Sequence, residues 1–278
     1  MEVEQSDLDR GRDLIASSKC LGDRTAVKPD ELNQRIRQIE GFIRALTQEC
    51  HILDERRHIL APLLNSAKIN AALKKKLDKT AGTRAWNHLA PLLGQDLLRD
   101  QARLFLDDDK RSGSLTNLWR KLGADPAIRV YFRDVYGRMF DDLNVGEIDG
   151  MSAESSAAIM ERFKQQDRNQ NHKRFDEGWA QVETDIAALK ANPVAAKIKT
   201  FRDKHHAHFE MQKLDEEPEP FDVNTVGLTF NEVLAFGDCC QAIVAELGLL
   251  LTGTSWDPKQ FSDASAKQGE AMWMALAN

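Results

Sequence analysis

The sequence predicts an all-α protein: an antiparallel helical bundle with a long N-terminal helix and a short C-terminal helical tail. Three observations favour this fold class. Glycine and proline number only 16 and 8 in 278 residues. No Asn-Gly or Asp-Gly dipeptide separates two alternating apolar runs, as a β-hairpin would require. Apolar residues instead recur at three- and four-residue intervals over long stretches, which is typical of amphipathic helices.

Composition limits the classes of function. A hydrophobic content of 42% and a charged content of 29% are ordinary for a globular chain that buries a core. The net charge of −6 argues against a protein that coats nucleic acid, because nonspecific affinity comes from neutralising phosphates. The four cysteines have no CxxC spacing, so we expect no metal site, and nothing in the sequence indicates a cofactor.

The N-terminal segment, residues 1–28, lacks sustained periodicity and is expected to be loosely ordered. Its first residues are acidic and lack the apolar core of a signal peptide. No apolar run in the chain approaches the roughly 18 residues that a membrane span needs. We therefore expect a cytoplasmic protein with reduced thiols and no membrane contact.

A long helix is predicted from Pro29, a first-turn proline that precedes two acidic residues. Its apolar seam lasts about three heptads, so the seam could serve an intermolecular zipper or an intramolecular bundle, and we favour the bundle. The seam consists of Leu32, Ile36, Ile39, Phe42, Ile43, Leu46, Cys50 and Leu53.

A lysine-rich stretch follows, and either a solvated helix face or a contact with an RNA backbone would explain it. The next helical pattern runs from Trp86 to Leu106, and Pro91 should start or kink that helix. The cations of the lysine-rich stretch are Lys68, Lys74, Lys75, Lys76, Lys79 and Arg84.

The middle of the chain alternates polar loops with capped helices. Residues 107–114 form a polar loop whose aspartates lack the ligand spacing of a calcium-binding EF-hand. Ser114 caps a short helix through Leu122, and Asp125 with its following proline opens another. Residues 152–190 form a long helix with an unusual polar window at residues 164–174.

Asn192 and Pro193 end that helix and start the next one. A final core helix runs from its N-cap, Thr229, to about Leu251 and ends at Gly253. Residues 29–252 thus form the helical domain. Residues 253–278 form a tail whose apolar patch should dock on the bundle or on a partner chain.

The segment from Phe201 to His208 is the strongest candidate for a functional site in the sequence. Its cations and imidazoles crowd together in an otherwise acidic chain, as a phosphate site would require. The alternative is an exposed cationic helix end, because an Arg-x5-His pattern is short. The residues concerned are Arg202, Lys204, His205, His206 and His208.

Arg202-Asp203 through Ala207-His208 resembles the motif of the HEPN superfamily (higher eukaryotes and prokaryotes nucleotide-binding). The arrangement is most similar to the abortive-infection U-type branch. There too, a stretch like residues 104–115 leads into a short helix, and the motif and a closing helix follow. The resemblance covers about residues 85–252.

The resemblance implies a bundle that forms a homodimer in which two Arg-x5-His segments face one another. It implies a metal-independent endoribonuclease of a phage-defence or toxin system, with RNA as substrate and an antitoxin or other defence-system protein as a further partner. The implied roles are acid–base catalysis for His208, stabilisation of the phosphorane for Arg202 and orientation of Arg202 for Asp203. The chemistry is sensible, because RNA supplies its own 2′-OH nucleophile.

Helix geometry suggests how the segment is arranged. At about 100° per residue, Arg202 and His208 lie roughly 120° apart on a regular helix, so a second chain would help them converge. Lys204, His205 and His206 are the expected RNA-binding neighbours. A reversal at residues 192–193 would bring residues 176–182 level with the motif.

The same reversal gives the polar window two interpretations. His172, Lys173 and Arg174 would then line the RNA cleft, with Arg174 the favoured residue, or they would belong to a merely solvated stretch. In some HEPN toxins a tyrosine lies two residues after the motif histidine. This chain departs from that pattern, because the corresponding residue is Glu210. Two other functions stay open: a noncatalytic RNA- or protein-binding module, and a structural subunit.

Overall fold

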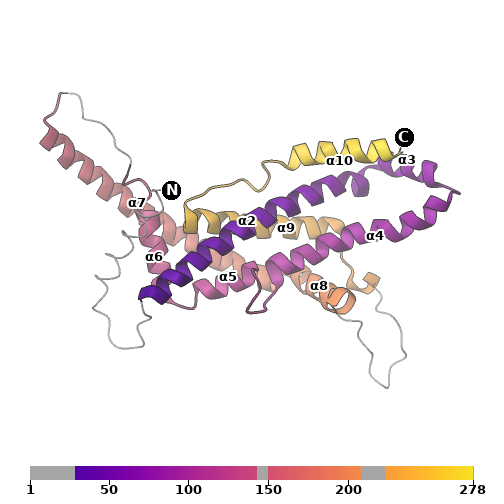
Figure 1. Ribbon diagram of the computed structural model, residues 1–278, viewed down its shortest axis with the longest axis horizontal. Helices are drawn as coiled ribbons and strands as arrows, with labels where there is room; N and C mark the ends of the chain where they lie inside the picture. The colour runs from indigo at the N-terminus through magenta and orange to yellow at the C-terminus, as the bar shows by residue number, and fades with distance from the viewer. Residues whose placement is uncertain (1–28, 143–149, 208–222, 278) are drawn as a thin grey trace, which may run out of the picture.

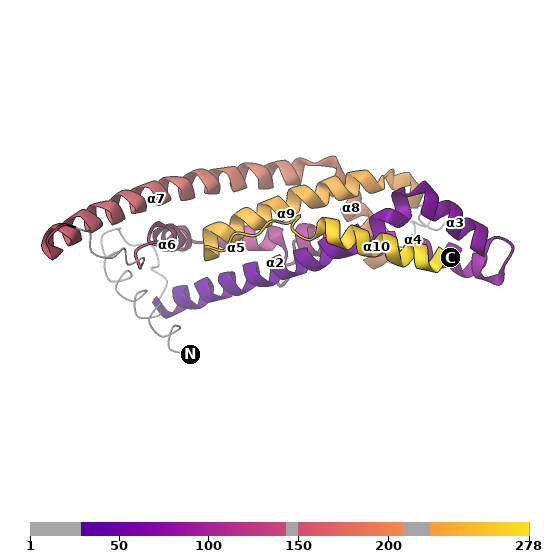
Figure 2. The same ribbon diagram turned by 90° about the horizontal axis from the view of Figure 1, so that it is seen from above.

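The computed structural model describes residues 29–142, 150–207 and 223–277, so the predicted loose segment 1–28 lies outside it. The described residues form an elongated bundle of helices without a strand (Figure 1), which confirms the all-α prediction. The long helices are α2 (Pro29–Asn65), α4 (Ala81–Gln101), α7 (Ala153–Ala191) and α9 (Phe230–Thr252). Helix α9 lies between α2 and α7, as Figure 2 shows.

Helix α2 buries its predicted seam inside the chain itself. Ile36, Ile43, Cys50 and Leu53 are all nearly inaccessible to solvent. They belong to the core that α2 shares with α9, with α5 (Leu115–Leu122) and α6 (Pro126–Gly137), and with the last helix, α10 (Ser262–Ala277). The intramolecular interpretation of the seam is therefore confirmed.

Helix α4 differs from its prediction, because it continues without a break through Pro91. The helix begins at Ala81 after its N-cap Thr80, ten residues before the boundary predicted near Pro91, so Pro91 does not start it. Pro91 lies on an exposed face of the helix. The carbonyl that loses its backbone donor there can be hydrated, which lowers the cost of proline inside a helix.

The predicted capping residues begin the following helices. Ser114 accepts a hydrogen bond from the backbone of Asn117 at the start of α5 (Leu115–Leu122). Asp125 caps α6 (Pro126–Gly137) and Ser152 caps α7. Thr229 forms a reciprocal capping box with Glu232 at the start of α9, which Gly253 ends in the left-handed conformation.

The first half of α7 explains the polar window of residues 164–174. In Figures 1 and 2 this half extends beyond the rest of the bundle. Phe163 is accordingly exposed, whereas the apolar seam begins at Phe175, where the helix enters the core. Arg168 in the window pairs with Asp141 at 2.6 Å. The window is thus polar because most of its residues face solvent.

Helix α9 is long and apolar enough to cross a membrane by length and composition. The expectation that no such run exists is therefore wrong. The same property is found in a helix at the centre of a bundle, and α9 is one. Residues such as Phe236, Cys240, Val244 and Leu247 are buried in the core.

The C-terminal helix α10 packs along α2 and touches α3 (Ala67–Leu77). The indole of Trp273 donates a hydrogen bond of 2.7 Å to the carbonyl of Ile59. Gly269 lies directly against the Ile59 backbone. The apolar patch of the tail thus docks on its own bundle, one of the two predicted alternatives.

A buried polar cluster joins α2, α9 and α10. The guanidinium of Arg57, 1% exposed, donates to Asp54 at 2.7 Å and to Gln241 at 3.0 Å, and also pairs with Asp238. Ser262 of α10 donates to the other oxygen of Asp54 at 2.9 Å. These bonds satisfy charges that would be costly to bury alone.

Candidate functional site

The predicted motif begins where α8 (Pro193–Phe201) ends. Asn192 caps this helix by accepting from the backbone of Val194, and Pro193 fits its first turn. Ile198 and Phe201 are buried, which fixes the residue before Arg202 in the core. The chain then forms a π-helical turn, η2 (Arg202–Ala207). Single π turns are rare and occur frequently at functional sites.

Arg202 lies between two carboxylates. Its Nε donates to Oδ1 of Asp203 at 2.7 Å, and its Nη1 lies 3.7 Å from Oδ1 of Asp107. The Arg202 side chain is 23% exposed, so the guanidinium is partly withdrawn from solvent. The bond to Asp203 is the one that orienting Arg202 would require.

Asp107 belongs to the polar loop that follows a second π turn, η1 (Ala102–Leu106), against which α8 packs. The loop is held by α5. Asn117 donates to the carbonyl of Lys110 at 3.1 Å and Thr116 to that of Phe105 at 2.7 Å. Ser114 also bonds the carbonyl of Asp107. These hydrogen bonds therefore fix the loop that carries the carboxylates beside the motif.

A second ion pair joins the loop to α8. Lys199 Nζ lies 3.1 Å from Oδ2 of Asp108, and this ammonium holds the pKa of the Asp108 carboxyl below its ordinary value. Two cations, Arg202 and Lys199, thus face three carboxylates, those of Asp107, Asp108 and Asp203. A phosphate that approaches Arg202 would meet the negative charge of these carboxylates, so its binding would depend on donors that they leave available.

The remaining residues of the motif are described in part. Lys204 is exposed in η2. The backbone of His205 and His206 continues η2, but their side chains and the whole of His208 lie outside the described part of the chain. The angle of roughly 120° expected between Arg202 and His208 assumed a regular α-helix. Arg202–Ala207 form a π turn instead, and the angle itself involves His208, so that prediction falls outside the described residues.

Arg174 lies apart from Arg202 within one chain. Residues 176–182 were expected to lie level with the motif, and this is wrong: Gly178 packs against Glu246 and Leu250 in the second half of α9. Arg174 is close enough to Tyr136 to act on the pKa of the phenol, which burial chiefly raises and Arg174 lowers. Helix α8 instead turns toward α4, η1 and the start of α9, where its apolar face is buried.

His172 and Lys173, the other two residues expected to line the RNA cleft, also have their contacts in this region. His172 packs against Gly137 at the end of α6, and burial lowers the pKa of its imidazole. Lys173 pairs with Glu177 on its own helix at 3.7 Å. The window and the Arg202 segment therefore belong to different parts of the bundle.

Asp107, Asp108 and Lys199 are site residues that the sequence analysis missed. The three consecutive aspartates were conspicuous, but they were interpreted only as a loop. Their approach to α8 depends on the direction in which α8 leaves Asn192, which local pattern does not determine. The signal that could have found them is charge, since an acidic loop and a cationic helix end are complementary.

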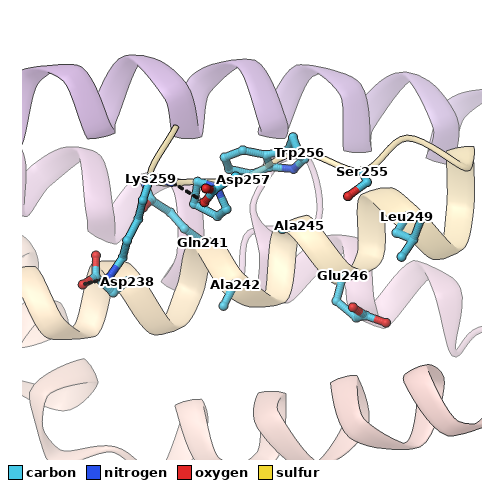
Figure 3. Close-up of a pocket in the computed structure, with 11 residues that line it drawn as sticks. Asp238, Gln241, Ala242, Ala245, Glu246, Leu249, Ser255, Trp256, Asp257 and Lys259 are labelled. Atoms are coloured by element: carbon cyan, nitrogen blue, oxygen red, sulfur yellow. Dashed lines mark hydrogen bonds and ion pairs between the residues drawn. The ribbon is translucent and has the colours of Figure 1, made fainter. Parts of the chain in front are cut away.

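A pocket of about 330 Å³ lies elsewhere, between α9 and the segment that leads to α10 (Figure 3). Asp238, Glu246 and Asp257 line it, and Lys259 is the single cation among its described lining residues. Lys259 also pairs with Asp238 at 3.4 Å. This excess of carboxylates does not suit a polyanion such as RNA.

Comparison with known proteins places these features in a family. The model of the AbiU2 family (HEPN_AbiU2) matches residues 36–272. The match extends well beyond the expected range of 85–252 and includes most of α2 and α10. No curated protein and no solved structure matches the chain. The match covers most of the chain, which therefore belongs to the AbiU2 family of HEPN-type abortive-infection proteins.

Proposed function

We propose that this protein is a metal-independent endoribonuclease of a phage-defence or toxin–antitoxin system that acts in the cytoplasm. The observation that carries the proposal is the Arg202 segment. Its guanidinium is held in place by Asp203 at the start of a π turn, in a chain that belongs to an abortive-infection family. An antitoxin or another defence-system protein would restrain the activity.

The proposed reaction needs only proton transfer and stabilisation of charge. The 2′-OH of RNA attacks the adjacent phosphorus, and the bond from phosphorus to the 5′ oxygen breaks. The products are a 2′,3′-cyclic phosphate and a 5′-OH. His208 would act as the general acid or base, a role that imidazole side chains take near neutral pH. Arg202 would stabilise the phosphorane with paired hydrogen bonds.

A homodimer is part of the proposal. Arg202 is engaged by Asp107 and Asp203 within its own chain, so a phosphate site needs further cationic and acid–base groups. A second copy of the segment would supply them across a two-fold axis. His205, His206 and Lys204 are the proposed neighbours of the bound RNA, and Arg174 would take part only from the partner chain.

An end-group analysis tests the reaction. The full chain would be incubated with RNA in EDTA, and the new ends would be identified by their reactivity toward phosphatase and kinase. We expect cyclic phosphate and 5′-OH ends from the wild type, and none from the His208→Ala variant with an unchanged circular dichroism spectrum. Fragments with 5′-phosphate ends would contradict the mechanism.

The noncatalytic alternative makes a different prediction. If the segment is only a grip for anions, a His208→Lys change keeps the positive charge and should preserve RNA binding. No product would then form with the wild type or with the variant.

A further inference from the structure

The basic arm, defined here as residues 66–90, consists of α3 and the first half of α4. It forms a helical hairpin at one end of the bundle (Figure 2). All its lysine and arginine side chains are exposed, and six cations accompany one carboxylate, Asp78, in a chain whose net charge is −6. The cations are Lys68, Lys74, Lys75, Lys76, Lys79 and Arg84.

The arm differs from most of the surface because six cations without acidic partners gather in one hairpin. Elsewhere, many cations on the helices have acidic partners, as in Arg103 with Glu49 and Arg133 with Asp176, although scattered ones such as Arg37 and Arg162 form no ion pair with a described residue. None of the six cations of the arm forms an ion pair with any described residue. A cluster of like charges without partners concentrates a positive potential, which attracts polyanions.

Lys79 adds an independent observation. It occupies the turn between α3 and α4 with φ of 58°, the one non-glycine residue of the described chain in the left-handed region. Glycine is favoured in this conformation and lysine is not. Local backbone strain is concentrated at functional positions, and here the strained position keeps a cation at the tip of the arm.

The packing of the arm favours RNA over a membrane. Ile69 and Leu73 of α3 are buried and Leu77 is half-buried, so the lysine-bearing helix has little apolar surface to insert into lipid. The exposed large apolar side chain of the arm is that of Leu89, on α4. Helix α4 leads from the arm to α8 and η2, against which it packs. Its 21 residues span about 30 Å.

We infer that the basic arm is a docking surface for the phosphate backbone of RNA, which it holds while another part of the same strand reaches the Arg202 segment. This inference rests on the proposed function for the identity of its ligand. Contacts to phosphates carry no base information, so the arm would bind RNA of any sequence. Each neutralised phosphate adds to the salt dependence of binding.

A binding experiment tests the arm separately from catalysis. The wild-type chain would be titrated with a labelled single-stranded 2′-O-methyl RNA, which lacks the nucleophile and cannot be cleaved. Replacement of Lys74, Lys75 and Lys76 by glutamine should lower the affinity at least tenfold at low salt. It should also reduce the slope of log K against log salt by about 2.

A matched control loses the same charge elsewhere. Glutamine at Arg37, Arg44 and Arg162, which are exposed on α2 and α7, should leave the affinity within about twofold of wild type. Equal losses in the two triple variants would show that only total charge matters and would overturn the inference. Binding of the arm to anionic phospholipid vesicles, with RNA affinity unaffected by the arm substitutions, would also overturn it.

Lys79→Gly separates a structural role from binding. Glycine relieves the left-handed backbone, so the melting temperature should stay the same or rise while the RNA affinity falls severalfold. Unchanged affinity would contradict the role of Lys79. Failure of the wild type to cleave ordinary RNA would remove the proposed reaction alone, because the uncleavable RNA reports only on the arm.

Discussion

Arg202 illustrates how a single residue of the site is controlled by its neighbours. The guanidinium faces Asp203 on its own turn and Asp107 on a loop almost a hundred residues earlier. The hydrogen bond to Asp203 holds the guanidinium, and under the proposed function the carboxylate of Asp107 would compete with a bound phosphate. Asp107 is therefore expected to tune affinity rather than to perform chemistry.

Asp107→Asn should lower the KM for RNA about two- to fivefold, since it removes a partly exposed charge interaction worth about 0.5–1 kcal/mol. Steady-state kinetics at low salt would measure the change. The matched control is Asp109→Asn in the same loop, because Asp109 bonds Arg111 and not the motif. A lower kcat with an unchanged KM would show instead that Asp107 positions Arg202.

The side chains of Asp54 and His58 make the stability of the buried cluster depend on pH. A hydrogen bond to the Asp54 carboxylate chiefly raises the pKa of His58 above its ordinary 6.5. Burial raises the pKa of Asp54, but its bonds to His58 and Arg57 outweigh burial and lower it below 3.8. Protonated His58 stabilises the folded state fully below pH 6.5, and this stabilisation is lost as pH rises through the pKa of His58 in the folded protein. Ionised Asp54 also stabilises the folded state, and its contribution is lost as pH falls through the pKa of Asp54 in the folded protein.

The free energy of unfolding should therefore decline as pH rises from about 6 to 8, and His58→Gln should flatten this part of the profile. Urea titrations at a series of pH values would measure it. His88→Gln, which changes an exposed histidine of α4, should keep the wild-type profile. Parallel profiles for wild type and His58→Gln would contradict the role of His58.

At the scale of elements, α10 is held on α2 by a close backbone approach. A Cβ on Gly269 would lie 2.4 Å from the carbonyl oxygen and 2.7 Å from the Cα of Ile59. Backbone atoms of Ile59, inside α2, cannot move aside independently of the helix. Glycine at position 269 is thus required by packing.

Gly269→Ala should lower the free energy of unfolding by about 1–3 kcal/mol through overpacking. Gly41→Ala in α2 is the control, because nothing lies within 4 Å of its Cβ. That change should stabilise the helix by about 0.5–1 kcal/mol. Denaturant titrations would compare the two. Equal stabilisation by both substitutions would show that α10 does not pack closely against α2.

The elements were predictable to the extent that local chemistry determines them. Ser114, Asp125, Ser152 and Thr229 each cap the helix predicted for them, because a side-chain oxygen satisfies the first backbone donors wherever the helix packs. The start of α4 was predicted too late because the free-energy cost of Pro91 inside a helix depends on its exposure to solvent, which is a tertiary property. The π turns were not predicted either, since no local signal for them was evident.

The site was predictable only in part for the same reason. Arg202 and Asp203 are neighbours in sequence, so their bond follows from proximity. Asp107 and Lys199 join the site through the direction in which α8 leaves Asn192, and the apolar face of α8 sets that direction. The same packing separates Arg174 from the motif within one chain.

At the scale of the whole molecule, the proposal requires two chains. The described part of one chain places Arg202 among carboxylates, and residues of the polar window lie elsewhere. A dimer in which two motif segments meet would combine Arg202 of one protomer with His208 of its partner. The arms of the two protomers would extend the positive surface available to one RNA strand.

The most direct test is complementation between two inactive variants in EDTA. Arg202→Ala and His208→Ala should each lose RNA cleavage, because each site then lacks one of its two groups. After unfolding and refolding together, mixed dimers contain one site in which an intact Arg202 faces an intact His208, and cleavage should return to a substantial fraction of the wild-type rate. Full activity of either variant alone, or no recovery in mixtures shown to contain mixed dimers, would contradict the account.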